Sequence, residues 1–170
     1  ELGKAQFTAT ACFACHGMDG KGVANLGPPL AESEWVAGPV ENLIGIQLRG
    51  LKGAISVNDV EYQFPAPMMP VGATKSNEET AAVLTYIRNS FGNSASAVTP
   101  GMVANYKEIN KEALSNEDIM AKMLNVSDLI VPPPIAVVGD APALPVIPSA
   151  GLGASGMGIA IFLIIGGLSV

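Results

Sequence analysis

The chain is poor in the residue types from which metal sites and nucleic-acid interfaces are commonly built. Its 170 residues include one histidine, two cysteines, one tryptophan and nine lysines and arginines, against fifteen aspartates and glutamates. The net charge of −6 and the lack of a basic cluster exclude nucleic acid as a partner. One histidine and two cysteines fall one short of the four ligands of a structural zinc site, which disfavours zinc.

These three scarce residues lie together in Cys12-Phe13-Ala14-Cys15-His16. Two thiols three positions apart, followed directly by histidine, form the attachment motif of c-type haem. On one turn of helix both sulfur atoms point the same way, each toward one haem vinyl group, and His16 presents an imidazole nitrogen to the iron. A thioredoxin-like dithiol would need a preceding strand and a βαβ pattern, and a Cys12–Cys15 disulfide would close too short a loop to stabilise much. The motif therefore predicts one covalently bound haem c.

Further segments stand at characteristic distances from this motif. They are Gly3-Lys4-Ala5-Gln6-Phe7, residues 12–17, Gly27-Pro28-Pro29-Leu30, Met69-Pro70 and residues 85–90. With them, residues 1–95 resemble the class I cytochrome c domain. The resemblance implies a mainly α fold of three to four helices around the haem, with a histidine and a methionine as axial ligands of the iron.

The same resemblance implies roles for further residues. In the family, the carbonyl of the first proline accepts a hydrogen bond from the outer ring nitrogen of the ligand histidine, which here joins Pro28 to His16 and makes His16 a better donor to iron. Leu30 would close over the haem edge. The sixth ligand is usually the methionine directly before a proline, which selects Met69, with Met68 as the alternative. A thioether ligand raises the reduction potential relative to a second nitrogen ligand.

Apolar periodicity predicts helices over 2–12, 40–53 and 77–90, and a hairpin or extended loop over 55–64. Gly3 has no side chain, so the last of these helices can cross the first closely there. Ser76 or Asn77 can cap the helix over 77–90.

Three residues are candidate partners for the haem propionates. Arg49 carries a charge that suits a carboxylate, and Trp35 and Tyr62 carry ring hydrogen-bond donors. A helix-end charge and a core ring are the alternative interpretations for Arg49 and Trp35.

The composition predicts four regions: a haem domain over 1–95, a short helical extension over 96–130, a Pro-rich linker over 131–150 and a membrane segment over 151–170. In the extension, Thr99-Pro100 is a helix start and Ser115-Asn116-Glu117-Asp118 resembles a capping box. These helices have too few large apolar residues for a core of their own, so we expect them to lie against the haem domain or another protein.

The last region contains no charged residue. A helix over 152–170 would be about 28 Å long, close to the bilayer's hydrocarbon thickness of about 30 Å. The segment is rich in glycine and ends without lysine or arginine, which favours packing against other transmembrane helices. A buried apolar tail in a soluble assembly is the alternative.

The sequence predicts an electron-transfer protein, not an enzyme, which is a subunit of, or tethered to, a membrane respiratory or photosynthetic complex. Its partners would be redox proteins and, through the C-terminal segment, membrane lipid. The haem domain would lie on the periplasmic or extracytoplasmic side of the inner membrane, and because no signal peptide is visible at Glu1, we expect a mature form or a chain without its leader. A free membrane-tethered shuttle, a haem sensor or peroxidase-like protein with an open iron position, and a structural subunit are the alternatives.

Overall fold

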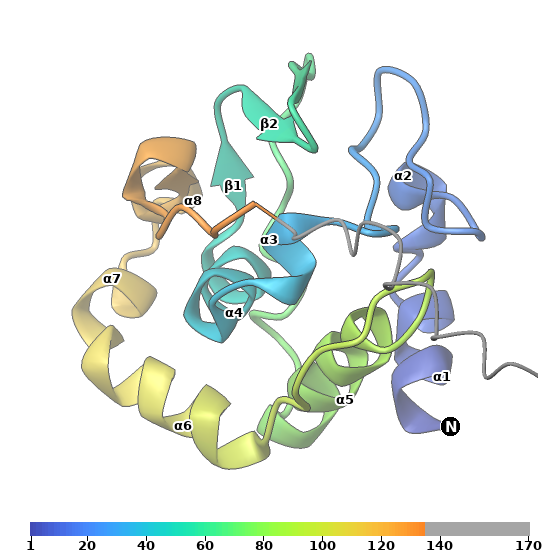
Figure 1. The fold of residues 1–170 in the computed structure, drawn as a ribbon. Helices are drawn as coiled ribbons and strands as arrows, with labels where there is room; N and C mark the ends of the chain where they lie inside the picture. Colours follow the sequence, from blue (N-terminus) through green and yellow to red (C-terminus); the bar gives the residue numbers. More distant parts are fainter. Residues whose placement is uncertain (135–170) are drawn as a thin grey trace, which may run out of the picture. The chain divides into compact units, whose positions relative to one another are not determined.

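The computed structural model describes residues 1–134, which lie within one compact unit. The predicted membrane segment, and the predicted linker beyond residue 134, lie outside the described residues. The fold is mainly α, as predicted (Figure 1). No helix within residues 1–134 has the length and apolar character needed to cross a membrane. The elements are α1 (Leu2–Ala9), α2 (Phe13–His16), α3 (Glu34–Ala37), α4 (Val40–Arg49), β1 (Leu51–Lys52), β2 (Ile55–Val57), β3 (Val60–Tyr62), α5 (Asn77–Arg88), α6 (Pro100–Ile109), α7 (Lys111–Ser115), α8 (Ile119–Lys122), β4 (Leu124–Asn125) and the 3-10 turn η1 (Val126–Asp128).

The first and fifth helices cross at a glycine, as the sequence predicts. A Cβ atom at Gly3 would lie 2.6 Å from Cβ of Tyr86 and closer still to the carbonyl oxygen of Ala82. Phe7 packs its ring against Tyr86 and Phe91, with centroids 5.6 Å away in both cases. Only glycine allows this approach, so the position of Gly3 determines where α1 crosses α5.

The predicted helix over 2–12 is wrong at its C-terminal end, because α1 stops at Ala9. Ala11 has a φ of +55°, in the left-handed region that costs a non-glycine residue about 1–2 kcal/mol. The amide of Cys12 closes this turn by donating to the carbonyl of Phe7 at 3.1 Å. Cys12 then enters α2 with helical backbone angles, so the haem motif occupies a separate helical turn.

The helix predicted over 40–53 also ends early, at Arg49, because Gly50 adopts a φ of +77°. The hairpin interpretation of 55–64 is confirmed, since β2 and β3 pair in antiparallel fashion. Asn58 and Asp59 form its turn with φ angles of +50° and +62°, as two-residue hairpin turns of type I′ require.

The prediction for the extension is confirmed at α6 and corrected further on. The side chain of Thr99 caps α6 by accepting from the amide of Met102. The segment from Ser115 forms no capping box. Ser115 instead ends α7, which the sequence analysis missed, and Asp118 caps α8 by accepting from the amides of Met120 and Ala121.

These helices pack on the first 95 residues, which is one of the two arrangements that their shortage of apolar side chains predicts. Val103 is fully buried in the same cluster as Leu43, Ile44 and Leu84. Farther along, the Asn42 side chain donates to the carbonyl of Ile130 at 2.7 Å and accepts from its amide at 2.9 Å. In Figure 1 the extension, coloured yellow to orange, runs past α4 and back toward α3.

Candidate haem-binding site

The haem motif folds so that both thiols and the imidazole line one cavity. Cys12 is half-buried and Cys15 is exposed, whereas His16 is only 8% exposed. Neither cysteine is in a disulfide, so both sulfur atoms are free to bond elsewhere. A single helical turn therefore presents the reactive groups that the sequence predicts.

The ring of His16 is held by a backbone carbonyl. Its Nδ1 lies 2.8 Å from the carbonyl oxygen of Pro28, so a hydrogen on Nδ1 is donated there. Burial lowers the pKa of His16, and the hydrogen bond to Pro28 opposes this effect more weakly. The imidazole is therefore neutral at neutral pH, with Nε2 available to a metal.

The loop that supplies Pro28 is fixed against the haem motif by close backbone contacts. A Cβ atom at Gly27 would lie 2.7 Å from the carbonyl oxygen of Cys15. The amide of Val23 donates to the same oxygen at 3.0 Å, and that of Leu30 donates to Gly20 at 2.7 Å. Glycine at position 27 thus allows the loop to approach the haem motif and aim the Pro28 carbonyl at the ring.

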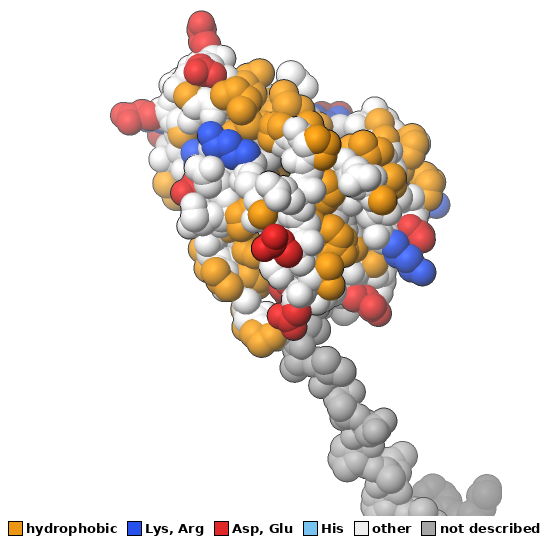
Figure 2. Space-filling model, turned by 90° about the horizontal axis from the view of Figure 1, so that it is seen from above, with side chains coloured by type: hydrophobic (Ala, Val, Ile, Leu, Met, Phe, Trp, Pro, Cys, Tyr) orange, Lys and Arg blue, Asp and Glu red, His pale blue; other side chains and the backbone are white. Residues whose placement is uncertain are grey.

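The cavity has a volume of about 640 Å³ and mostly apolar walls. Leu43 and Ile46 of α4 and Val83, Leu84 and Ile87 of α5 form its floor. Leu26, Met69 and Met120 line it too and are 56%, 49% and 52% exposed, so the cavity opens to solvent between them. Figure 2 shows this side of the molecule from above, where patches of hydrophobic side chains alternate with single acidic and basic ones.

All six predicted site residues line this cavity. Cys12, Cys15, His16, Pro28 and Leu30 come from the N-terminal part, and Met69 comes from the loop before α5. Met68 lines it as well, and its backbone pairs with Leu51 through hydrogen bonds of 3.0 and 2.9 Å.

Of the three candidate partners for the haem propionates, only Trp35 is among the described residues that line the cavity. Its indole N–H already donates to the carbonyl of Ser56 at 2.6 Å. Within residues 1–134, Arg49 and Tyr62 are not among the residues that line the cavity, and their role toward the propionates stays a prediction. The guanidinium of Arg49 turns to the carbonyl of Lys122, and Tyr62 stacks on Phe64.

Several lining residues were missed from the sequence. Lys52 is the only lysine, arginine, aspartate or glutamate at the wall that the described residues form, and it is the sole charge between Arg49 and Asp59 in the sequence. Met120 reaches the cavity from the extension, and no periodic pattern in the sequence indicates this position. Thr10 also lines it, and its buried hydroxyl has no hydrogen-bond partner within residues 1–134.

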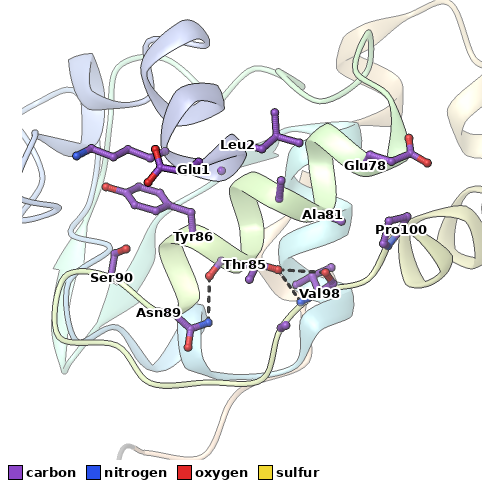
Figure 3. Close-up of a pocket in the computed structure, with 14 residues that line it drawn as sticks. Glu1, Leu2, Glu78, Ala81, Thr85, Tyr86, Asn89, Ser90, Val98 and Pro100 are labelled. Carbon is purple, nitrogen blue, oxygen red and sulfur yellow. Dashed lines mark hydrogen bonds between the residues drawn. The ribbon is translucent and has the colours of Figure 1, made fainter.

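A second hollow, of about 560 Å³, lies where α1 crosses α5 (Figure 3). Leu2 and Tyr86 face it, and the paired hydrogen bonds between Thr85 and Val98 close one side. Among the described residues, no cysteine, histidine or methionine lines this groove, so it lacks the thiols that attach haem c.

The first cavity fits a haem by the chemistry of its donors. Its lining includes the thiols of Cys12 and Cys15, the buried imidazole of His16 and the thioethers of Met68 and Met69, with apolar side chains around them. The buried hydroxyl of Thr10 has no hydrogen-bond partner among the described residues. This combination defines a haem protein of the covalent, c type.

The comparison with known families agrees. The family model described as cytochrome c matches residues 1–91, and the chain belongs to the cytochrome c family. No curated protein matches the chain. As in the family, the chain binds haem c covalently through Cys12 and Cys15 and carries electrons through it.

Proposed function

We propose that this protein carries single electrons with His16 and Met69 as axial ligands, as part of a membrane respiratory or photosynthetic electron-transfer complex. The observation that carries the proposal is one apolar cavity with His16 on one wall and the Met68-Met69 loop on another. The haem supplies one-electron chemistry through its iron. The protein holds both axial positions, which leaves none open for substrate.

The chain's own residues have distinct tasks in this proposal. Pro28 keeps the hydrogen of His16 on Nδ1, which leaves Nε2 to the iron. Leu30 and the helix side chains exclude water. Met69, flanked by Pro70, supplies a soft ligand that favours the reduced form. Its place directly before a proline favours it over Met68.

Lys52 is proposed as a partner of a haem propionate. It is the one cation at the described cavity wall, and an ammonium group suits a carboxylate. Its Nζ donates to the carbonyl of Met120 at 3.1 Å, which holds the side chain near the cavity.

The proposed location is the inner membrane, with the haem domain on the periplasmic or extracytoplasmic side. Residues 151–170 carry no charge and are long enough for one membrane helix. The Pro-rich residues 131–150 would tether the haem domain to it. Redox proteins of the same complex would be the partners.

The ligand assignment is tested by spectroscopy of the full chain. The ferric protein should show a near-infrared methionine–iron band, and Met69→Ala should remove it while Met68→Ala keeps it. The reverse pattern would move the ligand to Met68. A protein without the band would have an open or differently filled position, as a sensor or peroxidase-like protein requires.

The membrane assignment is tested on gently solubilised membranes. A native gel stained for haem should show the chain within a large assembly, whose other proteins mass spectrometry identifies. Ile161→Lys places a charge within the apolar segment, where it costs about 2.5–3.5 kcal/mol at a helix centre. It should release the haem from the membrane, whereas Ile161→Leu should not. Migration at the chain's own mass would favour a tethered shuttle.

A further inference from the structure

The short strand β1 lies between the methionine loop and the extension. On one side, Leu51 exchanges both backbone hydrogen bonds with Met68, at 3.0 and 2.9 Å. On the other side, β1 pairs in parallel with β4, where Leu51 stands opposite Leu124. The amide of Leu124 also donates to the carbonyl of Gly50 at 3.4 Å. Two residues of backbone thus connect the loop to a distant part of the chain.

A side chain of the extension reinforces this connection. A Cβ atom at Gly50 would lie 2.5 Å from the carbonyl oxygen of Met68 and 2.9 Å from Cε of Met123. Met123 is only 3% exposed. The same glycine is therefore pressed between the methionine loop and a buried side chain of the extension.

Polar contacts tie the ends of β1 to the extension as well. The Nε of Arg49 donates to the carbonyl of Lys122 at 2.8 Å, and Lys52 donates to the carbonyl of Met120. The extension has its own anchor on α4, the two hydrogen bonds between Asn42 and Ile130. It can therefore support β1 without depending on the methionine loop.

We propose that residues 120–130 form a brace that holds the methionine loop closed, with Met123 and Leu124 as positioning residues for the sixth ligand. The proposal rests on the proposed function, in which Met69 binds the iron. A loop fastened to a two-residue strand alone would open readily. The brace lies beyond residue 91, where the family match ends.

The test compares loop opening among variants of the full chain. Met123→Ala and Leu124→Ala remove the brace contacts. Two controls accompany them. Val103→Ala removes a fully buried side chain of α6 from a core cluster that does not contain Leu124. Met123→Leu keeps an apolar side chain of similar size in the brace. Imidazole competes for the sixth position only when the loop is open, so its affinity for the ferric protein reports the open population.

The two brace variants should bind imidazole about tenfold more tightly, since apparent affinity scales with the competent fraction. Hydrogen exchange at the Met68 amide should quicken by a similar factor. Val103→Ala and Met123→Leu should stay within about twofold of the parent. An equal change in Val103→Ala, or no change in the brace variants, overturns the brace.

The near-infrared band of the unmodified protein separates the two proposals. A parent without the band contradicts methionine ligation and the brace together. A parent with the band, and variants with unchanged imidazole affinity, contradicts the brace alone. If the alanine variants fail to fold, Arg49→Gln removes one brace contact at a half-buried site. It should raise imidazole affinity about threefold, and an unchanged affinity overturns the proposal.

Discussion

The two walls that carry the axial groups of the cavity are built in opposite ways. The wall of His16 comes from five consecutive residues and a loop twelve positions on, and its ring is buried and hydrogen-bonded to Pro28. The wall of Met69 is an extended loop that is supported by β1 and the extension, and the side chain of Met69 is half-exposed. The first wall is therefore built from residues close together in the sequence, whereas the second depends on contacts between described segments that are far apart in the sequence.

The largest effect is expected from substitutions in the wall that carries His16. The double substitution Cys12→Ser, Cys15→Ser leaves no thiol to bond the haem, so the denatured protein should carry none. Mass spectrometry of the denatured chain checks this, because covalent haem adds its mass to the polypeptide. Met18→Leu, at an exposed residue just beyond the motif, is the control and should keep the haem. Retention of haem mass in the double variant would contradict attachment through these thiols.

A pair of glycines sharpens the comparison. Gly50→Ala would place a side chain against Met68 and force a φ of +77°, at a cost of roughly 2–4 kcal/mol. Gly27→Ala would press on Cys15 without that backbone strain and should cost about 1–3 kcal/mol. Denaturant unfolding measures both costs.

Imidazole binding then separates the two walls, since only Gly50→Ala should loosen the methionine loop and increase the affinity. Gly101→Ala is the matched control, because its Cβ would meet only the Thr99 hydroxyl oxygen at an ordinary contact distance of 3.7 Å. It should stabilise α6 by about 0.5–1 kcal/mol. Equal imidazole affinities in Gly27→Ala and Gly50→Ala would remove the distinction between the walls.

The difference between the walls also explains what the sequence could predict. Cys12, Cys15, His16 and the aim of Pro28 follow from a motif and a nearby loop, whose spacing is visible in one sequence. The crossing at Gly3 follows from a helix pattern with a missing side chain. The break at Ala11 could not be predicted, because alanine gives no turn signal and the tertiary contacts override its helix propensity.

The contacts that support the methionine wall could not be predicted from the sequence either. Lys52 and Met120 are separated by 68 residues and meet only because the extension folds back. Arg49 is a candidate partner for a haem propionate, with a helix-end charge as the alternative, and its contact with the carbonyl of Lys122 could not be foreseen from the sequence. Pairing of β1 with β4 involves two residues each, which is too short a pattern to recognise by alternation.

The start of α5 offers a smaller test of the methionine wall, since this helix begins soon after Pro70. The hydroxyl of Ser76 accepts from the amide of Glu79, and the Glu79 carboxylate accepts from the amide of Ser76. Ser76→Ala should cost about 1 kcal/mol of stability. Thr99→Ala removes the corresponding cap of α6 and should cost a similar amount.

Hydrogen exchange distinguishes these two caps. The amide of Gly72 donates to the carbonyl of Gln47 and reports on the loop between Met69 and α5. Its exchange should quicken in Ser76→Ala and stay unchanged in Thr99→Ala. The same exchange rate in both variants would mean that the start of α5 does not support the methionine wall.

The smallest effect concerns charge at the same helix start. The amide of Glu78 itself, and next the Ser76 side chain, lower the pKa of the Glu78 carboxyl below its ordinary value of 4.5. The folded protein thus favours the ionised form, so the stabilisation is present above about pH 4.5 and is lost as the pH falls through the folded-state pKa. Glu78→Gln should therefore be less stable than the parent at neutral pH and equally stable at about pH 2. Glu61→Gln, on the exposed strand β3 away from any helix start, is the control. A stability difference for Glu78→Gln that persists unchanged into acid would mean that the side chain acts through packing, and the methionine wall would then owe nothing to charge at the start of α5.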